Sequence, residues 1–329
     1  MKVLNISSCL IILILLFTNG CKNKTENTST STTTAPVKKD VSGNYTDDSY
    51  VKRNEGYDWV AVIVKASSDS TLHISVRSRA DKKKPSCTFD ADAKLTNDST
   101  YTAVSEGKNI IFTFTDSTIS INTENEADKG ILNYFCSGGG SLEGNYKKIK
   151  EPLDEQQIDQ TVFSKTLVLQ NIGFDIKTTG KGASQQLTIQ PFGLKIDNSK
   201  ITTYVDGTVS GAEIEDLNAD GFPEVLIYTV SAGSGSYGNV IGYSVNNGKS
   251  VSQIYFPPIS ENKEASKGYM GHDEFTIVEN SLVQRFKTYN TVNANSTPSG
   301  NIRQIQYKLK DGEASRKFMA VNITEFSAK

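Results

Sequence analysis

Residues 225–245 read VLIYTVSAGSGSYGNVIGYSV, two apolar runs separated by a nine-residue segment rich in glycine and serine. The runs at 225–230 and 240–245 contain many β-branched and aromatic residues, which favour strands. Glycine loses much conformational freedom when it is ordered, so a simple connection rarely contains so much of it. The stretch therefore predicts two strands joined by a projecting loop that offers small hydroxyls, backbone N–H groups and the ring of Tyr237.

The alternation of polar and apolar residues continues on both sides of this stretch. It recurs at 72–76, 111–114 and 119–121, and again at 187–189 and 302–309. This period of two is typical of antiparallel strands with one buried face. Beyond the first 20 residues no long segment has a helical period. We therefore expect an all-β protein with two antiparallel β domains, the first barrel-like and the second a β-sandwich or barrel.

The expected domain boundaries are residues 41–149 for the small barrel and 150–329 for the second domain. The tripeptides Gly43-Asn44-Tyr45 and Gly144-Asn145-Tyr146 open and close the first domain. Matching first and last strands suit a closed barrel. The junction from 147 to 160 is charged and contains Pro152, and residues 154–162 are compatible with a short helix.

The cysteines indicate the redox environment. Of the four, Cys9 and Cys21 lie near the N-terminus, which leaves Cys87 and Cys136 in the first domain. In an oxidising compartment these two are expected to form a disulfide. The alternative is a pair of separate buried thiols.

The N-terminus predicts export. Residues 1–20 have a basic start and an apolar core too short to span a bilayer, as in a signal peptide. The following Gly20-Cys21 junction resembles a bacterial lipobox, in which Cys21 carries the lipid; an ordinary signal peptide with a chance cysteine is the alternative. Residues 21–40 are mostly Thr, Ser, Asn and Lys and predict a flexible tether. We expect a lipid-anchored protein of the bacterial cell envelope, on the periplasmic side of the outer membrane or at the cell surface.

Charge excludes one class of partner and gives no support for a cofactor. The chain has 35 Lys and Arg against 37 Asp and Glu, a formal net charge of −2. Such a balance gives no reason to expect nucleic acid. Membrane attachment is expected only through the N-terminal lipid, and no cofactor is expected.

The segment at 216–224, DLNADGFPE, has two interpretations. Asp216, Asn218 and Asp220 place oxygen ligands at alternate positions, as a calcium loop does. However, the twelfth position is Ile227, where a calcium loop has a bidentate glutamate, and a strand follows instead of a helix. An Asx-rich turn, in which these side chains bind their own backbone, is the preferred interpretation.

Catalysis by the glycine-rich loop has little support. Neither Ser234 nor Ser236 sits in a G-x-S-x-G elbow, and a phosphate-binding loop would need a helix and usually a lysine behind it. A Ser–His–Asp site with His272 and Asp273 is the remaining enzymatic alternative. We expect a protein that is not an enzyme.

The tetrad Ser-Gly-x-Tyr occurs twice, at 234–237 and at 42–45. The second copy is most simply the first strand of the barrel, so the tetrad by itself proves little.

The flanking segments distinguish the two copies. From about 161 to 326 the chain resembles the periplasmic inhibitors of i-type (invertebrate-type) lysozyme, through segments 216–224, 231–239, 269–275 and 303–309 in this order. The resemblance implies an all-β fold, no catalysis, and a loop that enters the lysozyme cleft through Ser234, Gly235, Ser236 and Tyr237. Further contacts would come from Tyr269, His272 and Tyr289. The chain departs from the family at 286–289, where Lys287 stands in place of an expected proline.

The residues fit this mechanism. A lysozyme cleft holds two carboxyl groups, and the hydroxyls of Ser234 and Tyr237 can donate hydrogen bonds to ionised oxygens. The alternative function is a non-catalytic envelope lipoprotein that binds a glycan or a protein ligand. The first domain lies outside the resemblance.

Overall fold

The computed structural model describes residues 40–180, 182–290 and 298–327, and from Val41 onward the chain forms one compact unit. The predicted signal peptide, the lipidation site Cys21 and the tether lie outside the described residues. In the described ranges, no helix has the length and apolar character needed to cross a membrane.

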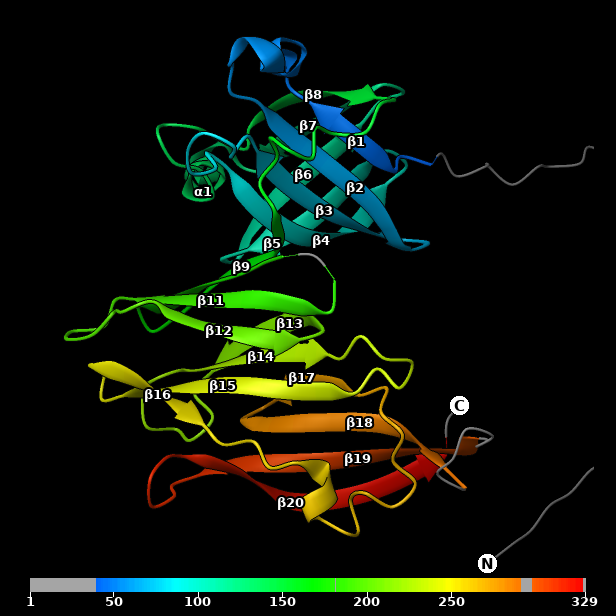
Figure 1. Cartoon of the computed structure of the whole chain (residues 1–329), viewed down its shortest axis with the longest axis vertical. Helices are drawn as coiled ribbons and strands as arrows, with labels where there is room; N and C mark the ends of the chain where they lie inside the picture. The colour runs from blue at the N-terminus through cyan, green and yellow to red at the C-terminus, as the bar shows by residue number, and fades with distance from the viewer. Residues whose placement is uncertain (1–39, 181, 291–297, 328–329) are drawn as a thin grey trace, which may run out of the picture. The chain divides into compact units, whose positions relative to one another are not determined.

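The first region is a closed antiparallel barrel (Figure 1). Its strands are β1 (Gly43–Thr46), β2 (Val60–Ser68), β3 (Thr71–Ser78), β4 (Thr88–Asn97), β5 (Thr100–Ser105), β6 (Lys108–Phe114), β7 (Thr118–Thr123) and β8 (Gly144–Ile149). Three short helices accompany them: η1 (Asp48–Glu55), η2 (Glu126–Asp128) and α1 (Gly130–Tyr134).

The two ends of this region pair with each other, as the matching tripeptides predict. In β1, Tyr45 lies opposite Val62 of β2 on one side and Lys148 of β8 on the other. The inward side chains fill the barrel with apolar volume, and those of Ile74, Phe112 and others are fully buried. The all-β prediction and the closed barrel are therefore confirmed.

A disulfide joins Cys87 to Cys136, as predicted, with a Cα–Cα distance of 4.1 Å. It connects the residue before β4 to the segment that follows α1. The disulfide lies wholly within the barrel region.

The junction between the two regions is an ordered strap and not a helix. Residues 155–157 form a turn, and β9 begins at Thr161, so the expected helix over 154–162 is wrong. Barrel residues bind this strap directly: Trp59 Nε1 donates to Gln157 Oε1 at 3.1 Å, and Thr88 Oγ1 donates to Asp159 Oδ2 at 2.9 Å. Residues 154–158 make a single turn, in which the N–H groups of Gln157 and Ile158 donate to the Asp154 carbonyl, and the tertiary bonds hold the chain that follows in an extended path into β9.

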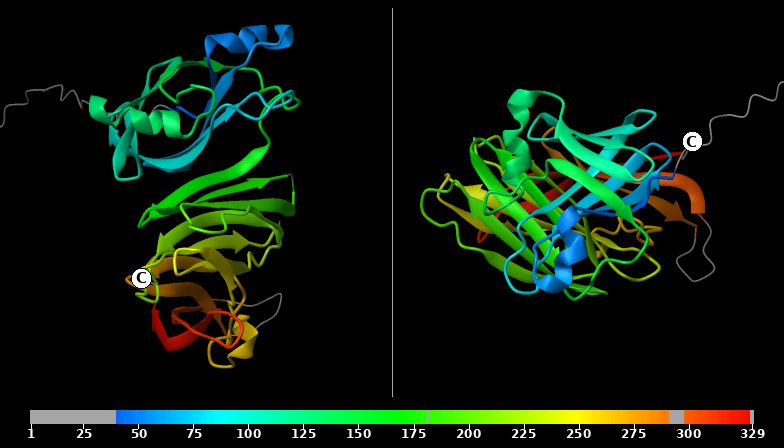
Figure 2. Two further views of the ribbon diagram at one scale, coloured as in Figure 1. Left: turned by 90° about the vertical axis from the view of Figure 1, so that its left-hand side faces the viewer. Right: turned by 90° about the horizontal axis from the view of Figure 1, so that it is seen from above.

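The second region consists of three four-stranded antiparallel sheets that follow one another as layers (Figure 1 and Figure 2). The first sheet contains β9 (Thr161–Leu169), β10 (Ile172–Thr179), β11 (Ser184–Phe192) and β12 (Ile201–Asp206). The second contains β13 (Thr208–Glu215), β14 (Glu224–Val230), β15 (Gly238–Asn246) and β16 (Ser250–Ile254). After η3 (Ile259–Glu261), the third contains β17 (Glu274–Val278), β18 (Ser281–Tyr289), β19 (Pro298–Lys310) and β20 (Lys317–Ser327).

The strand β14 explains why there are three layers and not the two of a sandwich. Val225 and Ile227 belong to the core shared with the first sheet, whereas Leu226 and Tyr228 belong to the core shared with the third. A strand that is buried on both faces reads as a continuous apolar run instead of an alternating one. The run at 225–230 thus places β14 in the middle of the stack and fixes the position of the loop that follows it.

Candidate functional site

The glycine-rich loop connects β14 to β15, and the two strands pair up to its base, where Val230 lies opposite Gly238. In Figure 1 it is the yellow-green connection beyond the end of β14. Two bonds close its neck: Ser231 N donates to the Tyr237 carbonyl at 2.9 Å, and Tyr237 N donates to Ser231 Oγ at 3.0 Å. The loop is therefore a closed turn on a paired base.

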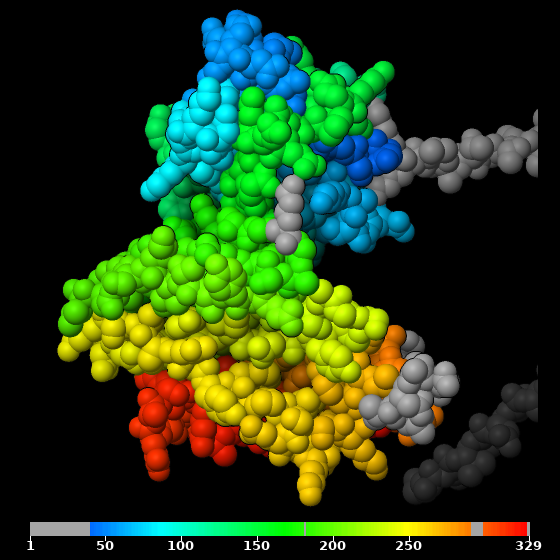
Figure 3. Space-filling view, in the orientation of Figure 1, coloured from blue at the N-terminus to red at the C-terminus, as the bar shows by residue number. Residues whose placement is uncertain are grey.

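The tip of the loop is compact and exposed. Ser236 N donates to the Gly233 carbonyl at 2.9 Å, which folds the tip into a tight turn. Ser234 is exposed, and 49% of the Tyr237 surface is accessible. A Cβ on Gly235 would lie 2.4 Å from the Tyr237 ring, so only glycine fits there with this ring position. In Figure 3 the yellow-green surface that includes this loop lies beside the orange surface, which belongs to residues later in the sequence.

The segment at 269–273 supports the loop from behind. The backbone N–H of His272 donates to the carbonyls of Gly235 and Ser236, at 3.0 and 3.1 Å. Gly271 has a φ of 82°, and a Cβ there would lie 2.0 Å from the Gly235 oxygen. The close approach of the two backbones therefore requires glycine at 271.

Aromatic rings continue this support into the third sheet. The ring of Tyr269 meets that of Tyr237 edge-on, with centroids 5.7 Å apart, and meets that of Phe286 at 4.8 Å. Edge-to-face pairs at these separations are favourable beyond their buried area. Tyr237 thus has one face held against the protein and the other exposed.

A partly buried carboxylate joins these parts. Asp273 Oδ2 accepts a bond from the Gly238 N–H at 2.7 Å and from the Tyr269 hydroxyl at 2.6 Å. Asp273 Oδ1 accepts from Gln284 Nε2 at 2.6 Å, and the Gln284 oxygen accepts from the Tyr307 hydroxyl at 2.7 Å. Burial raises the pKa of Asp273 and, together with its bond to Asp273, that of Tyr269.

The structure brings the sequence-predicted residues together. Ser234, Gly235, Ser236 and Tyr237 form the tip, and Tyr269 and His272 lie behind it. His272 and Tyr289 also line a groove of about 490 Å³ next to the loop. The remaining lining residues of the groove are Glu274, Arg285, Phe286, Lys287, Ile302 and Phe326.

Sequence reasoning missed Asp273 and Gln284 as parts of the support. Asp273 stood next to His272 in the segment that carries the resemblance, but was considered only as a partner for catalysis. In the structure its carboxylate is occupied by the loop, a tyrosine and a glutamine. Among the described residues, no hydrogen bond joins the His272 imidazole to Ser234 or Ser236.

The segment at 216–224 makes the bonds of an Asx-rich turn. The carboxylate of Asp216 accepts from the N–H groups of Asp220 and Gly221, at 3.1 and 2.9 Å. The carboxylate of Asp220 accepts from Phe222 N and, across the molecule, from the Arg316 guanidinium at 2.7 Å. The parts of the chain with coordinates contain no group of three or more His, Cys, Asp or Glu residues placed to hold a metal ion.

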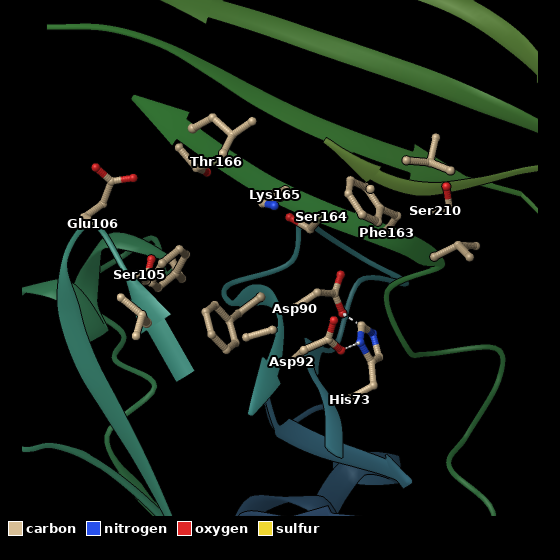
Figure 4. Close-up of a pocket in the computed structure, with 18 residues that line it drawn as sticks. His73, Asp90, Asp92, Ser105, Glu106, Phe163, Ser164, Lys165, Thr166 and Ser210 are labelled. Carbon is tan, nitrogen blue, oxygen red and sulfur yellow. Dashed lines mark hydrogen bonds and ion pairs between the residues drawn. The ribbon is translucent and has the colours of Figure 1, made fainter. Parts of the chain in front are cut away.

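A second cavity, of about 520 Å³, is shown in Figure 4. In it His73 lies between two carboxylates, with Nδ1 2.8 Å from Asp92 and Nε2 3.8 Å from Asp90. The bond to Asp92 raises the pKa of His73. Lys165 and Glu106 also line the cavity. Because acidic and basic groups are mixed around it, the lining favours neither an anionic nor a cationic ligand.

Comparisons with known proteins provide little. No family model and no curated protein matches the chain. Among solved structures, one similar chain is the GH32 beta-fructofuranosidase BmSUC1 of Bombyx mori, with 9% identity and a TM-score of 0.26. The match covers 76% of this chain and 57% of that enzyme, so the chain spans little more than half of the enzyme's length.

Proposed function

We propose that the protein is a lysozyme inhibitor of the bacterial envelope, directed at i-type lysozyme and held at the membrane by lipid on Cys21. Inhibition would occur when the loop at 231–238 enters the active-site cleft of the enzyme. One observation carries the proposal: the loop presents exposed Ser234 and Tyr237 on a neck that is closed by hydrogen bonds and supported from behind by the segment at 269–273. The resemblance to the inhibitor family names the partner.

The free hydroxyls at the tip support this role. Neither Ser234 Oγ nor the Tyr237 hydroxyl makes a hydrogen bond to any part of the described chain. Both can therefore donate to a partner without first breaking an internal bond. A bond to an ionised carboxylate contributes about 1.5–3 kcal/mol, and a lysozyme cleft contains two carboxyl groups.

The rigid base supports it as well. Binding by a mobile loop costs the free energy of ordering each side chain and backbone segment at the interface. Here the neck bonds, the turn at 233–236 and the ring contact with Tyr269 order the loop in the free protein. A preorganised tip with one aromatic anchor suits the centre of an inhibitory interface.

The direct test is inhibition of lysozymes of the c, g and i types by the chain from residue 40 onward. We expect the i-type enzyme to be inhibited and the double variant Ser234→Ala/Tyr237→Ala to inhibit about two to four orders of magnitude more weakly, because two charge-assisted bonds are lost. The inhibition constants are measured by turnover of a peptidoglycan substrate.

Tyr204→Ala is the matched control, since Tyr204 is another exposed tyrosine, with 71% of its surface accessible, and belongs to β12 of the first sheet and not to the proposed inhibitory loop. It should inhibit as well as the unmodified protein. Undiminished inhibition by the double variant would exclude the loop as the inhibitory site. Binding of peptidoglycan fragments with no inhibition of any lysozyme would instead favour a glycan-binding lipoprotein.

A further inference from the structure

The two ends of the loop at 231–238 are held by different contacts. At its start, Ser231 continues directly from the buried strand β14. At its end, Gly238 begins β15, and its N–H points to the Asp273 carboxylate at 2.7 Å instead of to a neighbouring strand. A Cβ on Gly238 would lie 2.6 Å from the Asp273 Cβ, so the backbone and this side chain are in close contact.

The same carboxylate oxygen also holds the ring beneath the tip. Oδ2 accepts both the Gly238 N–H and the Tyr269 hydroxyl, and the Tyr269 ring contacts the Tyr237 ring. The other oxygen, Oδ1, is held by Gln284 of β18, which Tyr307 of β19 holds in turn. A continuous chain of bonds therefore runs from the third sheet to the end of the loop.

We infer that Asp273 is the positioning residue of the loop, the group that fixes the end of the loop and the orientation of Tyr237 relative to the third sheet. The inference rests on the proposed function for its biological meaning, but its geometry does not. Asp273 need not touch a partner. It acts through Gly238 and Tyr269, and its loss would leave the loop attached but differently oriented and more mobile.

Three donors meet the two oxygens of Asp273, and this permits a sharp substitution test. Asp273→Ala removes the acceptor from all three. Asp273→Asn keeps one acceptor oxygen for Gly238 and Tyr269, provided that the Gln284 amide turns its oxygen towards the new NH₂ group. The Tyr307 hydroxyl then accepts from Gln284 instead of donating to it. The alanine variant should release the loop, and the asparagine variant should restore it.

The readout is hydrogen exchange of the Gly238 amide, followed by NMR in the chain from residue 40 onward. We expect exchange about tenfold or more faster in Asp273→Ala, because the single bond of this amide is lost. In Asp273→Asn it should stay within about threefold of the unmodified rate. The amides of Val225 and Leu226 in β14 should keep their protection in both, which separates positioning from a general loss of stability.

Asp47→Ala is the matched control, since Asp47 is also a partly buried carboxylate that accepts backbone N–H bonds, from Ser49 and Val60 in the barrel region. It should leave the exchange of Gly238 unchanged. If Asp273→Ala does not fold, Asp273→Leu serves in its place, because leucine has nearly the shape of the aspartate side chain and offers no acceptor.

Inhibition of i-type lysozyme is measured on the same variants, and Asp273→Ala should inhibit about tenfold or more weakly, with recovery in Asp273→Asn. Unchanged exchange at Gly238 in Asp273→Ala would overturn the inference, whatever the inhibition. If the unmodified protein inhibits no lysozyme, the proposed function fails while the exchange result still decides the role of Asp273.

Discussion

The tetrad Ser-Gly-x-Tyr stands in two regions of this molecule with opposite results. In the barrel, Tyr45 lies within β1, has 1% of its surface accessible, and donates its hydroxyl to the Val41 carbonyl at 2.7 Å. In the layered region, Tyr237 lies on a loop, is half exposed, and keeps its hydroxyl free of any partner in the described chain. Strand pairing on both sides of β1 makes the first copy a core element.

The comparison shows that the tetrad encodes no site by itself. A tyrosine whose side chain faces the interior of a closed barrel is buried, and its hydroxyl needs an internal acceptor. Tyr237 lies beyond the last residue pair of its hairpin, Val230 and Gly238, and its side chain can therefore remain exposed to solvent. The two copies can therefore be distinguished by how much a substitution of the tyrosine lowers the stability of the protein.

The largest expected difference concerns stability. Tyr45→Ala should lower the free energy of unfolding by about 3–5 kcal/mol, since it empties part of the barrel core. Tyr237→Ala should change it by less than about 1 kcal/mol, because half of this side chain is already exposed. Urea unfolding measures both. Equal losses in the two variants would mean that the loop is part of a core.

The disulfide allows the stability of the barrel to be compared with that of the loop. Cys87→Ala/Cys136→Ala should lower stability by about 3–4 kcal/mol, because the bond closes a long loop in the unfolded chain. The only tryptophan, Trp59, is buried against Tyr50 in the barrel region, so its fluorescence follows this unfolding. Loss of the signal at lower urea, with the Gly238 amide still protected in native buffer, is the expected result. Simultaneous loss of both would show that the loop depends on the barrel.

A smaller effect concerns the strand that carries the loop. Glu224 begins β14, is fully buried, and accepts from Leu217 N at 2.9 Å and Ser244 Oγ at 2.6 Å. Burial raises its pKa from 4.5 to about 7. Between these two values the folded protein binds more protons than the unfolded chain, so stability falls as the pH rises.

Glu224→Gln removes this titration while keeping the side-chain volume. Relative to the variant, the unmodified protein should lose about 1–3 kcal/mol between acid and neutral pH. Unfolding in urea at a series of pH values measures the difference. A parallel pH dependence of the two proteins would show that Glu224 titrates normally and that its proton plays no part in holding β14.

Much of the fold could be predicted because it rests on local patterns. Period-two alternation gave the strands, the matching tripeptides at 43–45 and 144–146 gave the closure of the barrel, and the cysteine count gave the disulfide. The hairpin turn at 246–249 depends on local sequence as well, since Asn247 and Gly248 both have positive φ and Asn-Gly is a pair that favours such turns.

Other features could not be predicted in this way, because they depend on what packs against what. The sequence of the junction is compatible with a helix. In the structure, Gln157 and Asp159 instead form hydrogen bonds with residues of the barrel. The third layer follows from the burial of both faces of β14, and a continuous apolar run does not distinguish this from other buried strands. Asp273 was visible in the sequence, but its role depends on Gly238, 35 residues away.

The all-β class, the disulfide between Cys87 and Cys136, and the loop with Ser234 and Tyr237 at its tip follow from the sequence, because alternation, cysteine pairing and turn chemistry act over short stretches or count few residues. Which Ser-Gly-x-Tyr copy is buried, which is exposed and how the exposed one is held follow from the tertiary structure alone. Those outcomes depend on long-range strand pairing and on the partly buried carboxylate of Asp273, which accepts hydrogen bonds from segments far apart in the chain.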